Sequence, residues 1–298
     1  MKVGERHEAG RREAASCVGI IAGSGRLPFL VAESIEASGR DVFVLSLASE
    51  AGADLGKFPG ITVKWGEIGR LLQALAEHDI RDVVITGGIG KRPDYRDIKL
   101  DAGAIRLFPR LVSVTFGSDD DILGKITSLF EEKGYRIVGA HEAAPDLVAS
   151  VGALGGLKPG SAERRDMALA RRAVAAIGRL NIGQAAIAAN GRVVGLEAAE
   201  GTDALITRIE QLRDAGRISG KPPSGVLVKA PKPGQDLRVD MPTIGPETVE
   251  RAVRAGLAGI AIAAGSVLVL DRAKVVEQAD AGRLFVWAFD ADGGEDER

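Results

Sequence analysis

Short runs of consecutive apolar residues alternate with helical patterns through the first half of the chain. The runs occupy residues 17–22, 41–47, 61–64 and 82–86. Apolar residues recur with helical spacing at 27–38 and again at 68–78. Runs that are apolar at successive positions are typical of strands buried on both faces, as in parallel sheets covered by helices. The alternation therefore predicts an α/β fold with a parallel sheet.

Glycines follow the first and the fourth of these predicted strands. Ligands of open parallel sheets bind outside the carboxyl ends of the strands, where backbone amides can hold an anion. We therefore expect a Rossmann-like nucleotide-binding domain over residues 16–144. Tight strand-to-helix turns would account for the same glycines without any ligand. The candidate substrate-binding residues of this domain are Gly23, Ser24, Gly25, Gly87, Gly88 and Lys91.

A dinucleotide such as NAD is not expected in this domain. The pattern of dinucleotide-binding turns, G-x-G-x-x-G, is broken because Pro28 stands where the third glycine belongs. No acidic residue closes the second predicted strand, which ends at Ser46 and Leu47. Pro28 instead suits the first turn of a helix. A nucleotide phosphate or a ribose in the same crevice is still compatible with the sequence.

The second half predicts a mixed α/β domain over residues 145–290. Asn190-Gly191 is a strong hairpin signal between two apolar runs, and a helix over 162–180 precedes that hairpin. This helix has a buried apolar stripe and is rich in arginine. We interpret its arginines mostly as a solvated face, although one of them could bind a phosphate. They are Arg164, Arg165, Arg171, Arg172 and Arg179.

Three carboxylates lie where a predicted strand of this domain passes into a helix, at Glu197, Glu200 and Asp203. Oxygen ligands of this kind suit a hard cation, so Glu200 is a candidate metal ligand. Thr202 and Asp203 join the candidate substrate-binding residues. Either of them would also serve as the N-cap of the helix that follows.

Composition and charge exclude several classes of protein. The chain has 298 residues, enough for two domains, and its net charge of −2 provides no positive field, so no nucleic-acid partner is expected. The single cysteine, Cys17, excludes an intramolecular disulfide. The uncharged run 255–270 is shorter than the about 20 residues that span a bilayer, so two short buried strands are predicted there. We expect a disordered leader over 1–15 and an acidic tail over 291–298.

Proline and charged residues concentrate between residues 222 and 246. Six of the twelve prolines lie in this stretch, and proline makes a backbone rigid and irregular. The side chains of such a loop therefore point in defined directions. The order Arg-Val-Asp-Met at 238–241 predicts a short strand with Arg238 and Asp240 on one face. As an alternative, these two residues would form only an exposed ion pair, worth about 0–1 kcal/mol.

The chain offers little besides carboxylate, lysine and arginine chemistry. It has three histidines and one cysteine, and it lacks G-x-S-x-G, Walker A and H-E-x-x-H motifs. Carboxylates suit a divalent ion such as Mg²⁺, and cations neutralise phosphate oxygens, which is most of what phosphoryl transfer requires. We assign Asp240, assisted by Asp236, as metal ligand or general base. The cations assigned to the reacting oxygens are Lys229, Lys232 and Arg238.

Five segments together resemble one known family. They are GIIAGSGRLP, DDDILGKI, GLEAAEGTDALITR, GVLVKAPKPGQDLRVDMPTIGPETVERA and AGLAGIAIAAG, and the resemblance covers about residues 17–289. The chain resembles the UDP-2,3-diacylglucosamine pyrophosphatases of the LpxI type. The resemblance implies two domains with a substrate cleft between them and a homodimer. It carries the essential aspartate of the family most naturally onto Asp240.

The resemblance also implies an activity. A member of this family would be a cytoplasmic, Mg²⁺-dependent hydrolase of lipid A biosynthesis. It would cleave UDP-2,3-diacylglucosamine into UMP and 2,3-diacylglucosamine 1-phosphate (lipid X), with water attacking the β-phosphorus. Because substrate and product are lipids, transient contact with the inner-membrane surface is expected. Two rival interpretations remain, a transferase that uses a UDP-sugar and a non-catalytic sensor of nucleotide-sugars.

Overall fold

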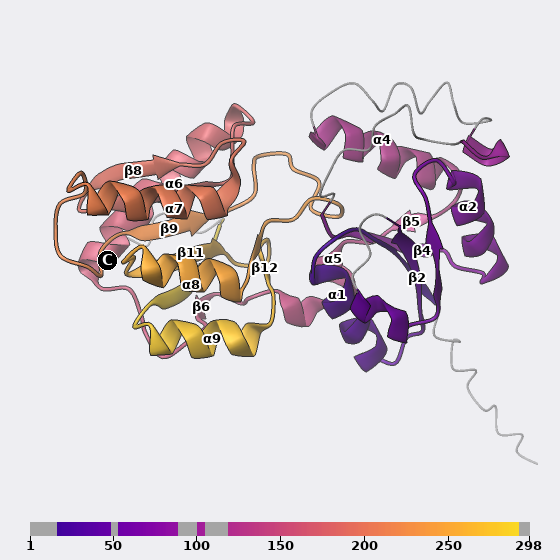
Figure 1. Cartoon of the computed structure of the whole chain (residues 1–298), viewed down its shortest axis with the longest axis horizontal. Coiled ribbons are helices and arrows are strands. Elements are labelled where there is room, and N and C mark those ends of the chain that lie inside the picture. Colours follow the sequence, from indigo (N-terminus) through magenta and orange to yellow (C-terminus); the bar gives the residue numbers. More distant parts are fainter. Residues whose placement is uncertain (1–16, 49–52, 89–99, 105–118, 292–298) are drawn as a thin grey trace, which may run out of the picture. The chain divides into compact units, whose positions relative to one another are not determined.

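The computed structural model describes residues 17–48, 53–88, 100–104 and 119–291 (Figure 1). The chain divides into two compact units. One comprises the chain up to Phe116 together with Ile126–Val138, and the other comprises Gly117–Lys125 and the chain from Gly139. The second unit thus resumes ahead of residue 145, where the sequence places the second domain. The predicted leader, Lys91 and all but the first residue of the predicted tail lie outside the described residues.

The N-terminal unit is built around a five-stranded sheet of order β3-β2-β1-β4-β5, in which every pair of strands is parallel. The predicted parallel α/β fold is therefore confirmed. Helices α1 and α2 follow β1 and β3, as the apolar spacing predicts. The elements are β1 (Val18–Ala22), α1 (Leu27–Ala37), β2 (Val42–Leu47), the 3₁₀ helix η1 (Ala53–Lys57), β3 (Gly60–Val63), α2 (Ile68–Glu77), β4 (Asp82–Thr86), α4 (Asp119–Glu132) and β5 (Arg136–Ile137). The part of α4 up to Lys125 belongs to the other unit.

The central strands of this sheet are buried because both of their faces are apolar. All five residues of β1 are buried, and it pairs with β2 on one side and with β4 on the other. Pro28 occupies the first turn of α1, where a proline loses no helical hydrogen bond. The strand order reverses between β1 and β4, and in open sheets this reversal marks the crevice where ligands bind.

A buried carboxylate ties the amino ends of this sheet together. Asp82, which begins β4, accepts hydrogen bonds from Arg136 at 2.8 and 2.6 Å and from Arg40 at 2.7 Å. Arg136 begins β5 and Arg40 precedes β2, so one side chain links three neighbouring parts of the fold. The hydrogen bonds from Arg136 are the main cause that lowers the pKa of Asp82, with a further contribution from Arg40.

The C-terminal unit contains a six-stranded mixed sheet of order β6-β13-β11-β9-β7-β8 and a two-stranded parallel sheet, β10-β12. The predicted mixed α/β architecture is confirmed. Strands β9, β11 and β13 are parallel, β6 and β7 pair antiparallel with β13 and β9, and β8 pairs antiparallel with β7. The elements are α5 (Ala140–Ala143), the 3₁₀ helix η2 (Pro145–Leu147), β6 (Gly152–Ala153), α6 (Ser161–Arg179), β7 (Ala185–Ala189), β8 (Arg192–Leu196), α7 (Gly201–Asp214), β9 (Val226–Lys229), β10 (Thr243–Ile244), α8 (Pro246–Arg254), β11 (Gly259–Ala263), β12 (Leu268–Val269), α9 (Arg272–Ala281) and β13 (Phe285–Phe289).

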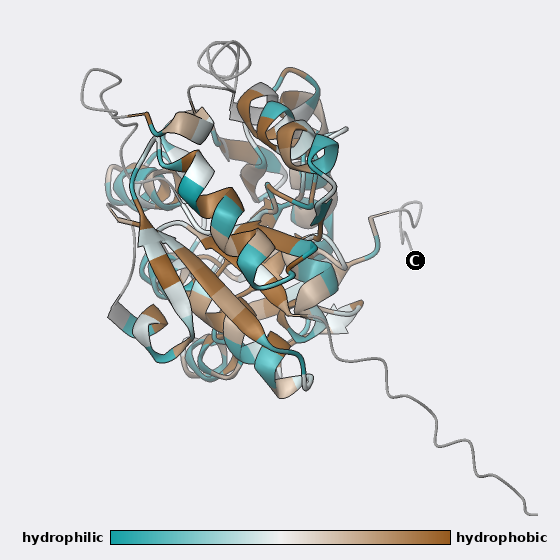
Figure 2. Ribbon diagram, turned by 90° about the vertical axis from the view of Figure 1, so that its right-hand side faces the viewer, coloured by the Kyte–Doolittle hydropathy of each residue, from teal (hydrophilic) through white to brown (hydrophobic). Residues whose placement is uncertain are grey.

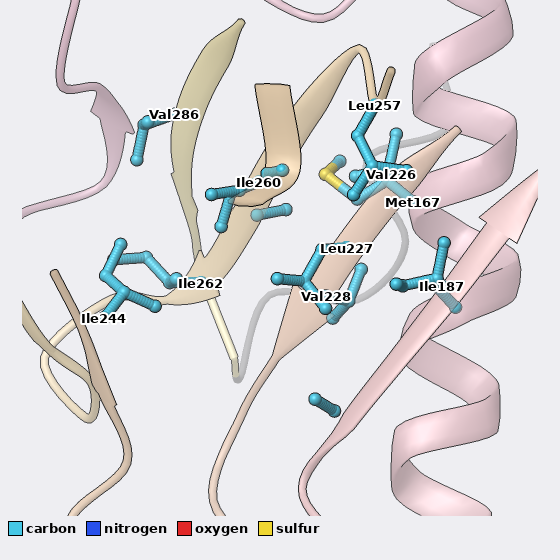
Figure 3. Close-up of a cluster of buried hydrophobic side chains, with 14 of the residues drawn as sticks. Met167, Ile187, Val226, Leu227, Val228, Ile244, Leu257, Ile260, Ile262 and Val286 are labelled. Carbon is cyan, nitrogen blue, oxygen red and sulfur yellow. The ribbon is translucent and has the colours of Figure 1, made fainter. Parts of the chain in front are cut away.

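The core of this unit lies between the strands and the helices that pack on them. Figure 3 shows side chains from β7, β9, β11 and β13 gathered with Met167 of α6. The strands are largely apolar along their length, whereas the helices alternate apolar and polar positions (Figure 2). The uncharged run 255–270 forms β11 and β12 in two different sheets. Within the described residues, no helix is long and apolar enough to cross a membrane.

The predicted hairpin is confirmed and is fixed by its turn. Strands β7 and β8 pair antiparallel across Asn190 and Gly191, both of which have positive φ angles. The carboxylate of Asp166, buried on α6, accepts the backbone N–H of Asn190 at 2.9 Å and of Gly191 at 2.7 Å. The basic helix therefore holds the hairpin turn through its single buried acid.

We expect Asp82→Asn to destabilise the N-terminal unit by about 2–3 kcal/mol, because two arginines lose a mostly buried carboxylate. Hydrogen exchange of peptides from β1 and β4 measures this loss. Since the pKa of Asp82 is lowered by folding, its contribution is complete above the pKa of the unfolded side chain. The contribution is lost as the pH falls through the lower, folded value.

A matched control for this substitution is Glu33→Gln. Glu33 binds Lys57 at 2.8 Å, but both side chains are about half exposed. Such pairs contribute about 0–1 kcal/mol. Equal losses of protection in Asp82→Asn and Glu33→Gln would contradict the role given to Asp82.

Candidate functional site

Within the proline-rich stretch, residues 230–242 form a loop that leaves the carboxyl end of β9 and returns to the fold at β10. In a first turn, the N–H of Gln235 donates a hydrogen bond to the carbonyl oxygen of Lys232 at 3.2 Å, and Gly234 has a positive φ angle. A second turn places the N–H of Asp240 on the carbonyl oxygen of Asp236 at 3.0 Å. The loop between the two strands is therefore ordered by its own backbone hydrogen bonds.

The short strand predicted at 238–241 is wrong, since these residues lie in the second turn and after it. Arg238 binds Asp236, with its Nε at 2.9 Å and its NH2 at 2.7 Å from the carboxylate oxygens. The same carboxylate accepts the backbone N–H of Arg238 at 3.1 Å. An aspartate that bonds the backbone two residues later favours a turn over an extended strand.

Asp240 is oriented by a residue that the sequence did not single out. The Nε2 of Gln235 donates to Oδ2 of Asp240 at 2.6 Å, and its Oε1 accepts the N–H of Lys232 at 2.8 Å. One amide side chain thus links the first turn of the loop to the carboxylate of Asp240. A glutamine within two residues of a Pro-Gly turn is the only sequence signal for this role, and it is weak.

Asp236 is held as a carboxylate by positive charge. The hydrogen bonds from Arg238 are the main cause that lowers the pKa of Asp236, and the charge of His141 adds to it. His141 lies in the short helix α5, and its Nδ1 atom is buried without a hydrogen-bond partner among the described residues. The role of His141 could not be predicted, because His141 is far from Asp236 along the chain and becomes its neighbour only in the fold.

Lys229 lies in the interior of the unit at the last position of β9. Its Nζ donates to the hydroxyl of Thr202 at 2.9 Å and to the carbonyl oxygen of Thr243 at 2.9 Å. Only 7% of the residue surface is exposed, which limits its direct access to a ligand. Burial lowers the pKa of Lys229, and the negative charges of nearby carboxylates, Glu197 first, oppose that shift.

A series of hydrogen bonds extends from Lys229 to the two ends of the β7–β8 hairpin. The hydroxyl of Thr202 donates to Oε1 of Glu197 at 2.7 Å, and Oε2 of Glu197 accepts the N–H of Gln184 at 2.8 Å. Glu197 and Thr202 are both buried. Thr202, predicted to bind substrate, therefore forms part of an internal network that connects the end of β8, α7, β9 and the start of β10.

The other predicted residues of this unit lie around the same strand ends. The Nζ of Lys232 donates to Oδ1 of Asn181 at 2.8 Å, just after α6. Glu200 is 3.3 Å from NH1 of Arg208, and Asp203 is 3.6 Å from Nε of Arg251. Within the described residues, no three acidic, histidine or cysteine side chains converge as a metal site. The assignment of Glu200 as a metal ligand stays a prediction.

In the N-terminal unit, the two predicted glycine loops lie side by side and bind each other. The N–H of Ser24 donates to the carbonyl oxygen of Gly88 at 2.7 Å, and the N–H of Gly88 donates back to Ser24 at 2.9 Å. The N–H of Gly23 is bound by Thr86. A Cβ on Gly23 would overlap the backbone of Gly88, so this close approach requires glycine. Because these three N–H groups already have partners, the predicted binding of an anion by backbone N–H groups would fall to Gly25 and Gly87.

The geometry defines a class of protein. Two α/β units each present polar loops at the carboxyl ends of parallel strands, where such folds bind ligands. In the second unit these loops carry carboxylates beside lysine and arginine, without a described histidine or cysteine cluster. That set of groups suits an enzyme that acts on phosphate esters or anhydrides.

Comparison with known proteins identifies the family. The model of the LpxI N-terminal domain matches residues 17–147, and the model of the LpxI C-terminal domain matches residues 150–287. The chain is 41% identical over 273 residues to the UDP-2,3-diacylglucosamine pyrophosphatase LpxI of Caulobacter vibrioides, an alignment that covers 92% of this chain and 97% of that protein. The chain belongs to the LpxI family. The resemblance found in the five sequence segments is thereby confirmed.

We expect Lys229→Met to destabilise the C-terminal unit by about 3–5 kcal/mol, because it leaves the buried carboxylate of Glu197 without its positive partner. The double variant Glu197→Gln/Lys229→Met is expected to lose less than the sum of the two single variants, since it removes both charges together. Urea unfolding of the four proteins measures this coupling.

The control for this cycle is Lys274→Met, which removes an exposed lysine of α9 and is expected to change stability by less than about 0.5 kcal/mol. Strictly additive losses in Glu197→Gln and Lys229→Met would contradict the buried network.

Proposed function

We propose that this chain hydrolyses the pyrophosphate bond of UDP-2,3-diacylglucosamine to UMP and 2,3-diacylglucosamine 1-phosphate. The observation that carries the proposal is the match to both LpxI domains together with the Caulobacter relative, whose name states this substrate and a pyrophosphatase activity. The carboxylates and cations gathered after β9 support it, because they are the groups that phosphoryl transfer uses.

Asp240 is the residue to which we give the central role, as metal ligand or general base. Its Oδ2 is fixed by Gln235, and Asp240 follows a turn that orients the side chain. Asp236 fits a metal ion less well, because both of its oxygens are bound by Arg238. We therefore assign Asp236 to holding Arg238 in place and Asp240 to the chemistry.

We propose Mg²⁺ as the cofactor, with Asp240 as its protein ligand. Mg²⁺ in proteins is usually held by one or two carboxylates together with water and substrate phosphates, so a single well-oriented aspartate suits it. When bound, the ion would neutralise charge on the pyrophosphate oxygens. Lys232 and Arg238, in the same loop as Asp240, would neutralise further charge on the pyrophosphate. Lys229 would hold the end of that loop in place through its hydrogen bond to the carbonyl oxygen of Thr243.

The remaining parts of the proposal concern where the enzyme works and how it holds the nucleotide. We propose that the enzyme works in the cytoplasm as a homodimer, in transient contact with the inner-membrane surface. In the N-terminal unit, Gly25 and Gly87 lie where the strand order reverses, and we propose that this crevice receives the nucleotide part of the substrate.

We expect Asp240→Asn to lower kcat by at least about a hundredfold, because loss of a general base or metal ligand typically has effects of about 10²–10⁴. Release of UMP from UDP-2,3-diacylglucosamine with Mg²⁺ measures the rate, and EDTA is expected to abolish it. The control Asp214→Asn changes an exposed carboxylate at the end of α7 and is expected to keep full activity.

The same assay separates the rival interpretations. A transferase would release UMP only when an acceptor other than water is added, and a sensor would bind the substrate without any metal-dependent turnover. Full activity in Asp240→Asn would overturn the assignment of the site while leaving the activity in place. Absence of UMP from the wild-type protein would overturn the proposed function.

An isotope experiment identifies which phosphorus is attacked by water. We expect hydrolysis in oxygen-18 water to place the label in 2,3-diacylglucosamine 1-phosphate, as attack at the β-phosphorus requires. In that case the P–O bond that breaks joins the β-phosphorus to the bridging oxygen, which leaves with UMP. Mass spectrometry of the two products reads the position, and label in UMP would instead indicate attack at the α-phosphorus.

A further inference from the structure

Helix α6 presents a stripe of arginines to solvent. Arg165, Arg172 and Arg179 follow one another at seven-residue spacing, which places them on one face of the helix, and all three are exposed. The only acidic residues of α6 are Glu163, in its first turn, and Asp166, which is buried beneath the hairpin turn. Beyond its first turn, the exposed face of α6 therefore carries positive charge alone.

Apolar side chains lie exposed at the carboxyl end of this stripe. Leu180 and Ile182 are 73% and 45% exposed, and Leu196 at the end of β8 is 40% exposed. Leu196 pairs with Ala186 in the neighbouring strand, and the backbone of Glu197 touches Gly183, so the end of β8 lies beside the segment that follows α6. Three of the five large apolar side chains exposed in the described chain thus gather at one end of α6.

This surface adjoins the candidate active-site loop. Lys232 reaches from that loop to Asn181, between the two exposed apolar residues Leu180 and Ile182. Pro233 packs against Gly178 in the last turn of α6. A ligand held along α6 would therefore lie next to the loop that carries Asp240.

We infer that the arginine stripe Arg165, Arg172 and Arg179, together with Leu180, Ile182 and Leu196, binds the surface of an anionic phospholipid bilayer. Arginines attract anionic headgroups, and exposed apolar side chains beside them enter the boundary between headgroups and acyl chains. A second copy of the chain fits this surface less well, because a two-fold interface would bring the arginine stripes of the two copies together. The inference rests on the proposed function only in that a lipid substrate gives the contact a purpose.

The test is sedimentation of the full chain with vesicles of phosphatidylcholine mixed with phosphatidylglycerol, compared with vesicles of phosphatidylcholine alone. The wild type is expected to bind the anionic vesicles, and less so at high salt. The variant Arg165→Gln/Arg172→Gln/Arg179→Gln is expected to bind them about a hundredfold more weakly, at about fivefold for each arginine. The variant Leu180→Ser/Ile182→Ser is expected to weaken binding at high salt as well as at low salt.

A matched control removes the same charge elsewhere on the C-terminal unit. Arg217→Gln/Lys221→Gln/Lys274→Gln replaces three exposed cations outside α6 and is expected to bind as the wild type does. Equal weakening in the control and the stripe variant would overturn the inference, and so would absence of wild-type binding. A dimer that dissociates in Leu180→Ser/Ile182→Ser with unchanged vesicle binding would also overturn it, by showing an interface between copies.

These vesicles contain no UDP-2,3-diacylglucosamine, so binding to them is read independently of hydrolysis. Failure of the proposed activity would leave the vesicle result standing, and failure to bind vesicles would leave the activity standing. With substrate dispersed in detergent, the stripe variant is expected to release UMP at the wild-type rate, because its three arginines lie outside the catalytic loop.

Discussion

The C-terminal unit depends on a lysine that lies almost entirely out of water. Moving a charged amine into the interior is costly unless its hydrogen-bonding capacity is met and an opposite charge lies near. Lys229 meets both conditions through Thr202, the carbonyl oxygen of Thr243 and the carboxylate of Glu197. Because these partners come from α7, β10 and the end of β8, the same contacts that make the burial tolerable also fix where the loop that carries Asp240 rejoins the fold.

The two units solve the placement of polar loops in different ways. In the N-terminal unit the loops after β1 and β4 approach so closely that their backbone groups bind each other, which consumes donors that an anion would otherwise use. In the C-terminal unit the loop after β9 is ordered by backbone hydrogen bonds within two turns, and its charged side chains are partly exposed. Under the proposed function, neutralisation of phosphate charge would therefore fall mainly to side chains of the second unit, whereas the first would contribute its glycine loops.

The features that could be predicted from the sequence are those determined by a few neighbouring residues. Strands of the first unit follow from consecutive apolar residues, and the hairpin follows from Asn190-Gly191, since each signal lies within a few residues. Four residues are too few to separate a strand from a turn, so the pattern at 238–241 predicted the wrong backbone conformation for Arg238. The burial of Lys229 could not be predicted, because its partner Glu197 is remote in sequence and becomes a neighbour only when β7 pairs with both β8 and β9.

The net charge of a chain does not show how charge is distributed over a single helix. A net charge of −2 gives no reason to expect attraction to an anionic surface. Helix α6 nevertheless separates charge by sign, because its buried side holds Asp166 against the hairpin turn while its outer side keeps the arginines. Fields near a surface act over about 10 Å at moderate salt, so a binding partner senses this face and not the whole protein. The same helix can thus fasten the fold on one side and attract a membrane on the other.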